Sequence, residues 1–452
     1  MMSIAEQLQI VNKIALSVSK NGGCTYFVGG YVRDELMQVE CKDIDIEVHG
    51  ISKDVLEDIL DSIGERIEFG KSFGIYNLKG CSVDIAMPRK ERLVGTTHRD
   101  FEVDVDPFIG TEAAARRRDF TINALMKNVL TGEIVDHFGG INDLNYGIIR
   151  HVSDNTFAED ALRVLRAAQF ASRFGFTIAD ETVNLCKGMD LKSLSGERVF
   201  EELRKALLKS NKPSLFFKNL LSMDRLSEWF KEIENLIGVE QNKKYHAEGD
   251  VWTHTMMVLD EAAKHRHLVK NPLGFMLTAV VHDFGKSICT KNVNGKIHSY
   301  MHETEGLPLV REFLTRITSE NALINYVMNM VRLHMQPNTM AADKSSIKAT
   351  NKMFDQSAQP LDLIYFSLCD RLGKVSLVQS DSSEPFLMER LKVFEEYMSR
   401  PYVMGRDLIK SGIKPSQNYK ELLSYAHKLR LAGIPKDLAL KQTLAYAREK
   451  RK

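Results

Sequence analysis

The sequence predicts an α+β fold: a head with a small mixed sheet, followed by a remainder that is almost entirely helical. Strand-like runs concentrate before residue 147, where "TYFVGG", "DIDIEV", "IYNLKG" and "SVDIAM" alternate with helical stretches. After residue 148 such runs become rare, and long amphipathic patterns with a helical period dominate. At 452 residues the chain is too long for a single core, so several domains are expected.

Breaks in the helical patterns divide the chain further. The run "KSNKPS" at 209–214 interrupts a helix, "VEQNKKYHAEGD" at 239–250 is a polar linker, and "SDSSEPF" at 380–386 indicates another boundary. The predicted domains are therefore a head at 1–147, a helical neck and body at 148–240, a third helical domain at 241–380 and a helical tail at 381–452.

Composition indicates an ordinary soluble protein, with 44% hydrophobic and 27% charged residues. No stretch approaches the roughly 18 apolar residues of a membrane span, and the six cysteines are scattered without metal-binding spacing, so a cytoplasmic location with free thiols is predicted. The net charge of +1 attracts no polyanion globally. A nucleic acid would have to be held by local basic clusters, which occur at 116–118, at 163–173 and at the C-terminal end.

The run "CKDIDIEV" carries the first candidate site. A period of two places Asp43, Asp45 and Glu47 on one face of a strand, with apolar residues on the other. A solvated acidic face would show the same alternation. However, two carboxylates on a rigid strand also suit Mg²⁺, and such a site can hold two ions about 4 Å apart that activate a hydroxyl and neutralise a leaving pyrophosphate. Asp84, on a later strand, is the predicted third carboxylate.

A double glycine precedes this strand and strengthens the metal interpretation. Gly29 and Gly30 lack side chains, so the backbone can approach a triphosphate closely, and the N–H groups of the following helix favour negative charge. Arg33 lies in the first turns of that helix and is a further candidate for nucleotide binding. In "RRRDFTINAL", Arg116, Arg117 and Arg118 supply forked donors for phosphate.

Several of these runs together resemble a known family. "GGYVRD" and "DIDIEV", followed by "RRRDFTINAL", "DHFGGINDLNYGIIRHV", "EDALRVLRAAQFASRFGF" and "GERVFEEL", are similar in order to the motifs of class II CCA-adding tRNA nucleotidyltransferases, which belong to the polymerase-β-like superfamily. The resemblance implies template-independent addition of C, C and A to the 3′ end of tRNA from CTP and ATP, with Mg²⁺ as cofactor. It also implies that Arg118, Asp119 and Asn123 recognise the ribose; the last two are expected four apart on one helical face.

The run "EDALRVLRAAQF" bears on the choice of base. Asp160 and Arg163, expected as neighbours on a helix, offer an acceptor beside a donor, which matches the amine and ring nitrogen of cytosine and adenine but not of uracil and guanine. The resemblance implies the same role for both residues, and Arg166 is a further nucleotide-binding candidate in this basic helix. Between Met87 and Arg116 a polar, glycine-punctuated loop is expected, which in the family helps to switch specificity from C to A.

The run "AVVHDFGKS" carries the second candidate site, because His282 and Asp283 follow an apolar helix. Together with His254 and Asp370 on flanking helices, this order resembles the HD phosphohydrolase superfamily, and the resemblance implies that these four residues bind a divalent metal of unknown identity. His302 and His334 are further candidates. Such a site would hydrolyse phosphorylated or 2′,3′-cyclic-phosphate RNA ends, which offer no free 3′-hydroxyl for extension.

Two alternatives remain open from the sequence. A poly(A) polymerase or a partial CC- or A-adding enzyme shares the motifs of the head. A tRNA-binding protein without catalytic activity would keep the fold but not the acidic pair. For the CCA-adding enzyme the expected partners are the tRNA 3′ end, ATP and CTP, and no membrane.

Overall fold

The computed structural model describes residues 2–39, 43–69, 75–93, 101–377, 382–415 and 419–449. At 69, 90–93 and 101–104 it describes the backbone alone. The chain forms two compact units: residues 1–206 with 215–229, and residues 207–214 with 230–452. The predicted head and most of the predicted neck therefore lie in the first unit. Within the described ranges, none of the helices combines the length and apolar character that a membrane crossing requires.

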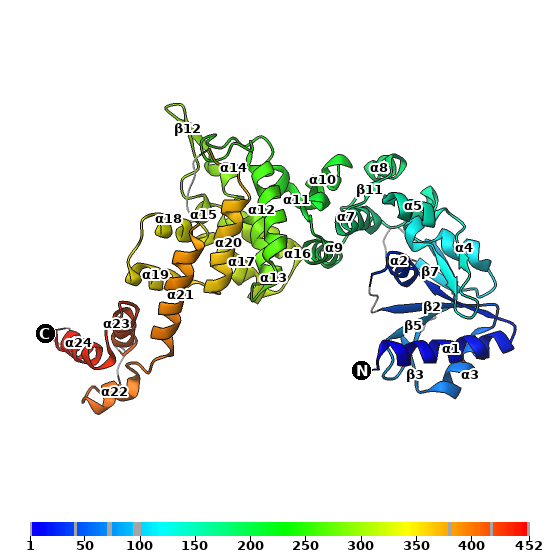
Figure 1. The fold of residues 1–452 in the computed structure, drawn as a ribbon, viewed down its shortest axis with the longest axis horizontal. Coiled ribbons are helices and arrows are strands. Elements are labelled where there is room, and N and C mark those ends of the chain that lie inside the picture. The colour runs from blue at the N-terminus through cyan, green and yellow to red at the C-terminus, as the bar shows by residue number, and fades with distance from the viewer. Residues whose placement is uncertain are drawn as a thin grey trace. The chain divides into compact units, whose positions relative to one another are not determined.

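The first unit contains the strands of the head and the first helices (Figure 1). Its elements are α1 (Ile4–Lys20), β1 (Cys24–Val28), α2 (Gly30–Leu36), β2 (Ile44–His49), α3 (Lys53–Ile63), β3 (Arg66–Phe69), β4 (Ile75–Leu78), β5 (Val83–Ala86), β6 (Arg89–Leu93), β7 (Phe101–Val105), α4 (Gly110–Arg116), the 3-10 turn η1 (Thr121–Asn123), β8 (Met126–Asn128), β9 (Ile134–Val135), α5 (Gly140–Tyr146), β10 (Ile148–Ile149), α6 (Asp154–Ala158), α7 (Leu162–Phe174), β11 (Thr177–Ile178) and α8 (Asp180–Lys187). Helices α9 (Gly196–Lys209), α10 (Ser214–Ser222) and α11 (Ser227–Glu234) contribute residues to both units.

A seven-stranded mixed sheet organises the head, in the order β3-β4-β5-β2-β1-β8-β9. Strands β2 and β5 pair in parallel, whereas the other neighbours pair antiparallel. The four strand-like runs predicted from the sequence correspond to β1, β2, β4 and β5, so the mixed sheet is confirmed. In β2 and β5, apolar and polar residues alternate, so the two faces of each strand carry different side chains.

One face of the sheet is the core of the head. Helices α1 and α3 lie on this face (Figure 1), where their apolar residues contact those of β2. Ile44, Ile46 and Val48 of β2 are almost fully buried there. The opposite face carries the acidic residues of β2, and next to them a smaller cluster that includes Val28 and Ala115. The apolar face thus fixes the strand, and its alternation directs the carboxylates away from the core.

Three expectations about this region are wrong in detail. Residues 119–123 form no regular helix, because only the short 3-10 turn η1 spans Thr121–Asn123. Asp160 lies just before α7 and not on it, although a turn still joins it to Arg163, whose backbone N–H donates to the Asp160 carbonyl at 3.0 Å. The expected polar loop after Met87 contains the antiparallel strands β6 and β7 and the helix α4, while its residues 94–100 lie outside the described ranges.

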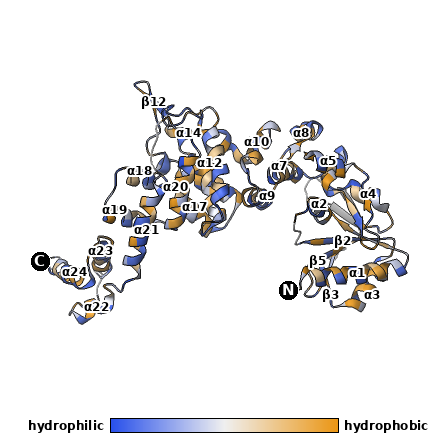
Figure 2. Ribbon diagram, viewed as in Figure 1, coloured by the Kyte–Doolittle hydropathy of each residue, from blue (hydrophilic) through white to orange (hydrophobic). Residues whose placement is uncertain are grey.

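The second unit is helical, as predicted. Its remaining elements are α12 (Val251–His265), α13 (Pro272–Val281), α14 (Lys286–Cys289), β12 (Lys291–Val293), β13 (Lys296–His298), α15 (His302–Glu305), α16 (Leu307–Ile317), α17 (Asn321–Leu333), α18 (Gln336–Ala342), α19 (Ile347–Gln356), α20 (Pro360–Leu372), α21 (Glu384–Ser399), α22 (Gly405–Lys410), α23 (Tyr419–Leu431) and α24 (Lys436–Glu449). Figure 2 shows hydrophobic and hydrophilic residues alternating along α12 and α17, as expected for helices with one buried face. Every residue of α13 from Gly274 to Val281 is buried.

A buried carboxylate joins three parts of this helical unit. Asp362 of α20 is fully buried and accepts hydrogen bonds from the backbone N–H groups of Lys270 and Asn271 and from the Tyr326 hydroxyl. In Asp362→Asn the amide NH₂ replaces one acceptor and faces a donor. We expect a loss of about 1–3 kcal/mol of unfolding free energy, measurable by urea denaturation. An unchanged midpoint would contradict this role.

Candidate functional site

The acidic residues of the head meet at the boundary between two parallel strands. The β2–β5 register places Asp45 directly opposite Asp84. Asp43 is exposed and precedes β2 by one residue. The sequence predicted these three carboxylates as one group, and the pairing of the strands brings Asp45 and Asp84 together.

Electrostatics supports a cation site at this point. Burial raises the pKa of Asp45, and the negative charges of Asp84 and Asp43 raise it further, while Arg118 opposes this change. Negative charge is therefore in excess around Asp45. A hard divalent cation held by the three carboxylates would offset that excess, so the residues present fit Mg²⁺.

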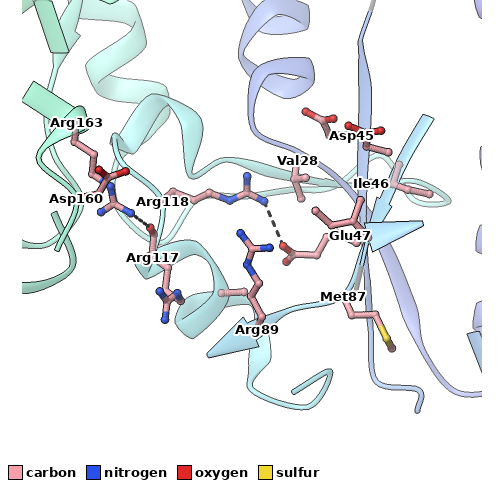
Figure 3. A pocket seen from close by; sticks show the side chains of 14 residues that line it. Val28, Asp45, Ile46, Glu47, Met87, Arg89, Arg117, Arg118, Asp160 and Arg163 are labelled. Atoms are coloured by element: carbon pink, nitrogen blue, oxygen red, sulfur yellow. Dashed lines mark hydrogen bonds and ion pairs between the residues drawn. The ribbon is translucent and has the colours of Figure 1, made fainter. Parts of the chain in front are cut away.

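A cavity of about 420 Å³ opens beside these acids. Its lining is Val28, Asp45, Ile46, Glu47, Ile75, Asp84, Ala86, Met87, Arg89, Ala114, Arg117, Arg118, Asp160 and Arg163. Figure 3 shows Arg118 and Arg89 extending from one side towards Glu47, with Asp160 and Arg163 at the far end from Asp45. Asp45 and Asp84 thus lie at one end of the cavity and arginines line its walls, an arrangement suited to a metal-bound polyphosphate.

The double glycine allows another side chain to approach the backbone closely. Gly29 has φ +62°, and a Cβ at this position would lie 3.3 Å from Nη1 of Arg118, so the guanidinium packs against the glycine backbone. Gly30 begins α2. Arg33 does not line the cavity: it is buried, pairs with Asp34 at 2.6 Å and donates to Oδ1 of Asn123 at 2.5 Å. The structure therefore places Arg33 in the support of the site.

Only some residues of the "RRRD" run line the cavity. Arg117 and Arg118 line the cavity, whereas Arg116 pairs with Glu112 and lies over the Phe138 ring. Asp119 is buried and accepts from Asn123 Nδ2 at 3.0 Å and from Arg166 Nε at 2.7 Å. Although burial raises its pKa, the pKa of Asp119 is lowered overall, chiefly by Arg166. Asp119, Asn123 and Arg166 thus form a charged network next to the cavity, and none of them lines it.

The residues predicted to choose the base have partners that the sequence did not indicate. Asp160 is held by Arg198 of α9, whose Nη2 donates to both carboxylate oxygens at 3.0 and 2.9 Å. Arg163 donates to the backbone carbonyls of Thr156 and Arg117 at 2.6 and 2.9 Å. Both side chains are therefore fixed at the cavity wall before any ligand binds.

Two charged lining residues, Glu47 and Arg89, were not among the predicted site residues. Glu47 was recognised only as the third acid of its strand face, although the period of two places it beside Asp45. Arg89 lies in the segment expected to be a loop, and no local pattern distinguishes it from its charged neighbours.

The second site lies in the helical unit, where the predicted ligands converge. Nε2 of His254 on α12 lies 3.1 Å from Asp370 on α20 and 3.6 Å from Asp283. Nε2 of His282 lies 3.3 Å from Asp283. Ligand atoms of His254, His282 and Asp370 all lie within 4.8 Å of one another. The four residues named from the sequence are therefore neighbours, although they come from three separate segments.

A second set of ligands adjoins the first. Asp283, His302 and His334 have ligand atoms within 4.8 Å of one another, and Asp283 also lies 3.3 Å from His282 of the first set. The Nε2 atoms of His302 and His334 face each other at 3.3 Å. His302 and His334 are the two further candidates from the sequence.

Backbone contacts fix the protonation of these imidazoles. The Nδ1 atoms of His282, His302 and His334 face the carbonyl oxygens of Ala279, Ser299 and Val331 at 3.1, 2.8 and 2.6 Å. Because a carbonyl only accepts, each Nδ1 carries the hydrogen and each Nε2 presents a lone pair. The pKa of His334 is lowered to about 3 by burial and by His282 and His302. In the absence of a metal the contact with Asp283 raises the pKa of His302, although burial opposes this. In their neutral form, imidazoles of this tautomer with carboxylates between them fit a divalent transition metal.

A cavity of about 400 Å³ leads to these ligands and is lined by Asp283, His302, His334 and Asp370. Lys286 and Lys374 also line it, and Nζ of Lys286 lies 2.7 Å from Asp283. The acids in this lining are both candidate metal ligands, so the remaining charge is positive. An anionic substrate matches that charge.

Comparison with known proteins identifies the parts of the chain. Residues 25–150 match the family model of the poly A polymerase head domain, and residues 175–237 match that of the probable RNA and SrmB-binding site of polymerase A. The multifunctional CCA protein of Pasteurella multocida is 33% identical over 412 residues, covering 88% of this chain and 94% of the relative. That of Actinobacillus pleuropneumoniae serotype 5b is 34% identical, covering 70% and 76%.

Solved structures share the fold. A CCA-adding enzyme in complex with ATP matches with a TM-score of 0.67 at 20% identity, covering 99% of this chain and 97% of that one. The Thermotoga maritima CCA-adding enzyme in complex with tRNA matches with a TM-score of 0.63 at 20% identity, covering 99% of both chains. The predicted polymerase-β-like nucleotidyltransferase fold is thereby confirmed. Since the match to the Pasteurella relative spans nearly its whole length, the chain belongs to the family of multifunctional CCA proteins.

Proposed function

We propose that this protein adds C, C and A to the 3′ end of tRNA from CTP and ATP, and that its helical unit hydrolyses phosphorylated or cyclic-phosphate RNA ends. The observation that carries the first activity is the placement of Asp45 opposite Asp84 at the end of a cavity whose walls bear Arg117 and Arg118. Family membership supports it, because the relatives are named multifunctional CCA proteins.

In the head, Asp43, Asp45 and Asp84 would hold Mg²⁺. When bound, the metal lowers the pKa of the attacking 3′-hydroxyl and offsets charge on the leaving pyrophosphate. Arg117 and Arg118 donate to the triphosphate from the cavity wall. The charged network of Asp119, Asn123 and Arg166 lies next to the cavity, where Asp119 and Asn123 would recognise the ribose of the nucleotide.

Base selection falls to the far end of the same cavity. The carboxylate of Asp160 accepts from an exocyclic amine and the guanidinium of Arg163 donates to a ring nitrogen, which favours cytosine and adenine. Arg198 holds Asp160 by two hydrogen bonds, so the template is rigid before the nucleotide enters. A uracil or guanine would leave desolvated groups unpaired, at a cost of about 1–3 kcal/mol each.

In the helical unit, His254, His282, Asp283 and Asp370 would hold a divalent metal. Such a metal, when bound, would polarise a phosphoryl group and make a water molecule more acidic. Lys286 and Lys374 attract the phosphate into the cavity. Trimming of a blocked RNA end would restore the 3′-hydroxyl that the head requires.

A tRNA transcript that lacks CCA tests the first activity. With each labelled triphosphate in turn and with both together, we expect two C and then one A to be added, and neither UTP nor GTP to be used. Sequencing of the product ends gives the order. Absence of incorporation with Mg²⁺ present would refute nucleotidyl transfer by this protein.

The match to the family model of the poly A polymerase head domain supports one alternative function, a poly(A) polymerase. A poly(A) polymerase would extend the same transcript with a run of A from ATP alone, and a partial adder would stop after CC or add only the last A. The length and sequence of the labelled product therefore distinguish a CCA-adding enzyme, a poly(A) polymerase and a partial adder. A tRNA-binding protein without activity would bind the transcript and leave its length unchanged.

A further inference from the structure

The strand that carries the candidate metal ligands also carries a buried charge without a catalytic assignment. Glu47 lies two residues after Asp45 on the same face of β2, and it is 7% exposed. A buried carboxylate is costly unless it is paired and hydrogen-bonded. Its partners therefore indicate why a glutamate stands there.

Both oxygens of Glu47 have a partner. Oε1 lies 2.8 Å from Nε2 of His49, the next residue on the same face of the strand. Oε2 accepts a hydrogen bond of 3.3 Å from Nη2 of Arg118, drawn as a dashed line in Figure 3. The carboxylate therefore contacts the Arg118 guanidinium on one side and the His49 ring on the other.

The far side of Arg118 is confined as well. A Cβ at Gly29 would approach Nη1 to 3.3 Å, so the guanidinium lies between the Gly29 backbone and Glu47. His49 in turn contacts the Tyr26 ring edge to face, with centroids 5.4 Å apart. The chain from Tyr26 to Arg118 is packed at every step, and its last member lines the cavity.

We propose that Glu47 is a positioning residue that aims the Arg118 guanidinium at the triphosphate of the incoming nucleotide. The proposal rests on the nucleotidyl transfer proposed above. Because Arg118 would contact the phosphates in the bound state as well as during transfer, loss of Glu47 weakens nucleotide binding more than it slows turnover. Glu47 does not serve as a metal ligand, since both of its oxygens are engaged by His49 and Arg118.

The test compares Glu47→Ala, Glu47→Gln, Arg118→Ala and the Glu47→Ala/Arg118→Ala double variant. We expect Glu47→Ala to raise KM for CTP and ATP about tenfold, as for loss of a charged hydrogen bond, with a smaller change in kcat. Glu47→Gln keeps an acceptor of the same shape and should retain part of the affinity. The double variant should be no worse than Arg118→Ala, because Glu47 acts through that arginine.

Two further readouts decide between explanations. The Mg²⁺ concentration for half-maximal rate should stay unchanged in Glu47→Gln; an increase would identify Glu47 as a metal ligand and overturn the proposal. Additive effects in the double variant would also overturn it. Glu57→Gln is the matched control, since Glu57 pairs with Arg66 at 2.9 Å and accepts from the Tyr76 hydroxyl, outside the cavity. Calorimetric titration with CTP measures affinity even if turnover fails, and so separates this inference from the proposed function.

Discussion

Replacing Asp45 with asparagine is expected to lower the rate of nucleotide addition about a thousandfold, equivalent to ~4 kcal/mol of transition-state stabilisation. Asp45 faces Asp84 across two parallel strands and would ligate the metal that activates the hydroxyl. The raised pKa of Asp45 shows that its charge is disfavoured in the folded protein without a cation. Asparagine removes that charge, so the thermal unfolding temperature measured without metal should not fall. Rate and stability then change independently.

A carboxylate elsewhere in the head provides the control. Asp58 is exposed on α3, which lies over the apolar face of the sheet. Asp58→Asn changes the same functional group and should leave incorporation of labelled CTP within about twofold, since surface substitutions rarely exceed 0.5 kcal/mol. If Asp45→Asn retained more than a tenth of the wild-type rate, Asp45 would not be a ligand of the reactive metal.

The acidic site of the head could be predicted because it depends on one strand. The period of two in "CKDIDIEV" determines which side chains share a face, and the apolar partners Ile44, Ile46 and Val48 determine which face is buried. The contribution of Asp84 follows from a strand pairing that no local pattern encodes. Asp84 could nevertheless be named as a candidate, because it lies within a second strand-like run.

The base-selecting end could be predicted only in part, because its partners are distant in sequence. Asp160 and Arg198 are 38 positions apart and meet through the packing of α9. The spacing of three made Arg163 a neighbour of Asp160, and a backbone hydrogen bond of 3.0 Å joins them although Asp160 precedes α7, but that spacing does not indicate Arg198. Likewise, the contact between the Arg33 guanidinium and Asn123, 90 positions away, does not follow from any local pattern. Sequence periodicity does not indicate such long-range contacts.

In the helical unit, too, local patterns predicted some features of the site, whereas contacts between distant residues could not be predicted. The apolar run before His282 and Asp283 predicted a helix ending at the site, and α13 ends at Val281. His302 and His334 remained only candidates, since no spacing links them to Asp283. The orientation of the imidazoles depends on backbone carbonyls at Ala279, Ser299 and Val331, which the sequence does not distinguish from any others.

Asp283→Asn is expected to lower hydrolysis of a 2′,3′-cyclic nucleotide at least about a hundredfold, because it removes a proposed ligand of the reactive metal, and to leave CCA addition unchanged. Oδ1 of Asp283 lies 3.2 Å from His302, and Oδ2 lies 3.3 Å from His282. The variant therefore removes the charge shared by both ligand sets, and bound metal per chain should fall with activity. Metal content by mass spectrometry and release of product by chromatography measure the two effects.

Stability must be separated from chemistry in this variant, because Asp283 is 1% exposed and pairs with Lys286. Asp362→Asn is the matched control: it changes another buried carboxylate of the same unit, outside the cavity, and should lower stability while hydrolysis is retained. His334→Ala then separates the two ligand sets. If His254, His282, Asp283 and Asp370 alone hold the reactive metal, His334→Ala keeps most of the activity; if hydrolysis survives in Asp283→Asn itself, the site lies elsewhere in the protein.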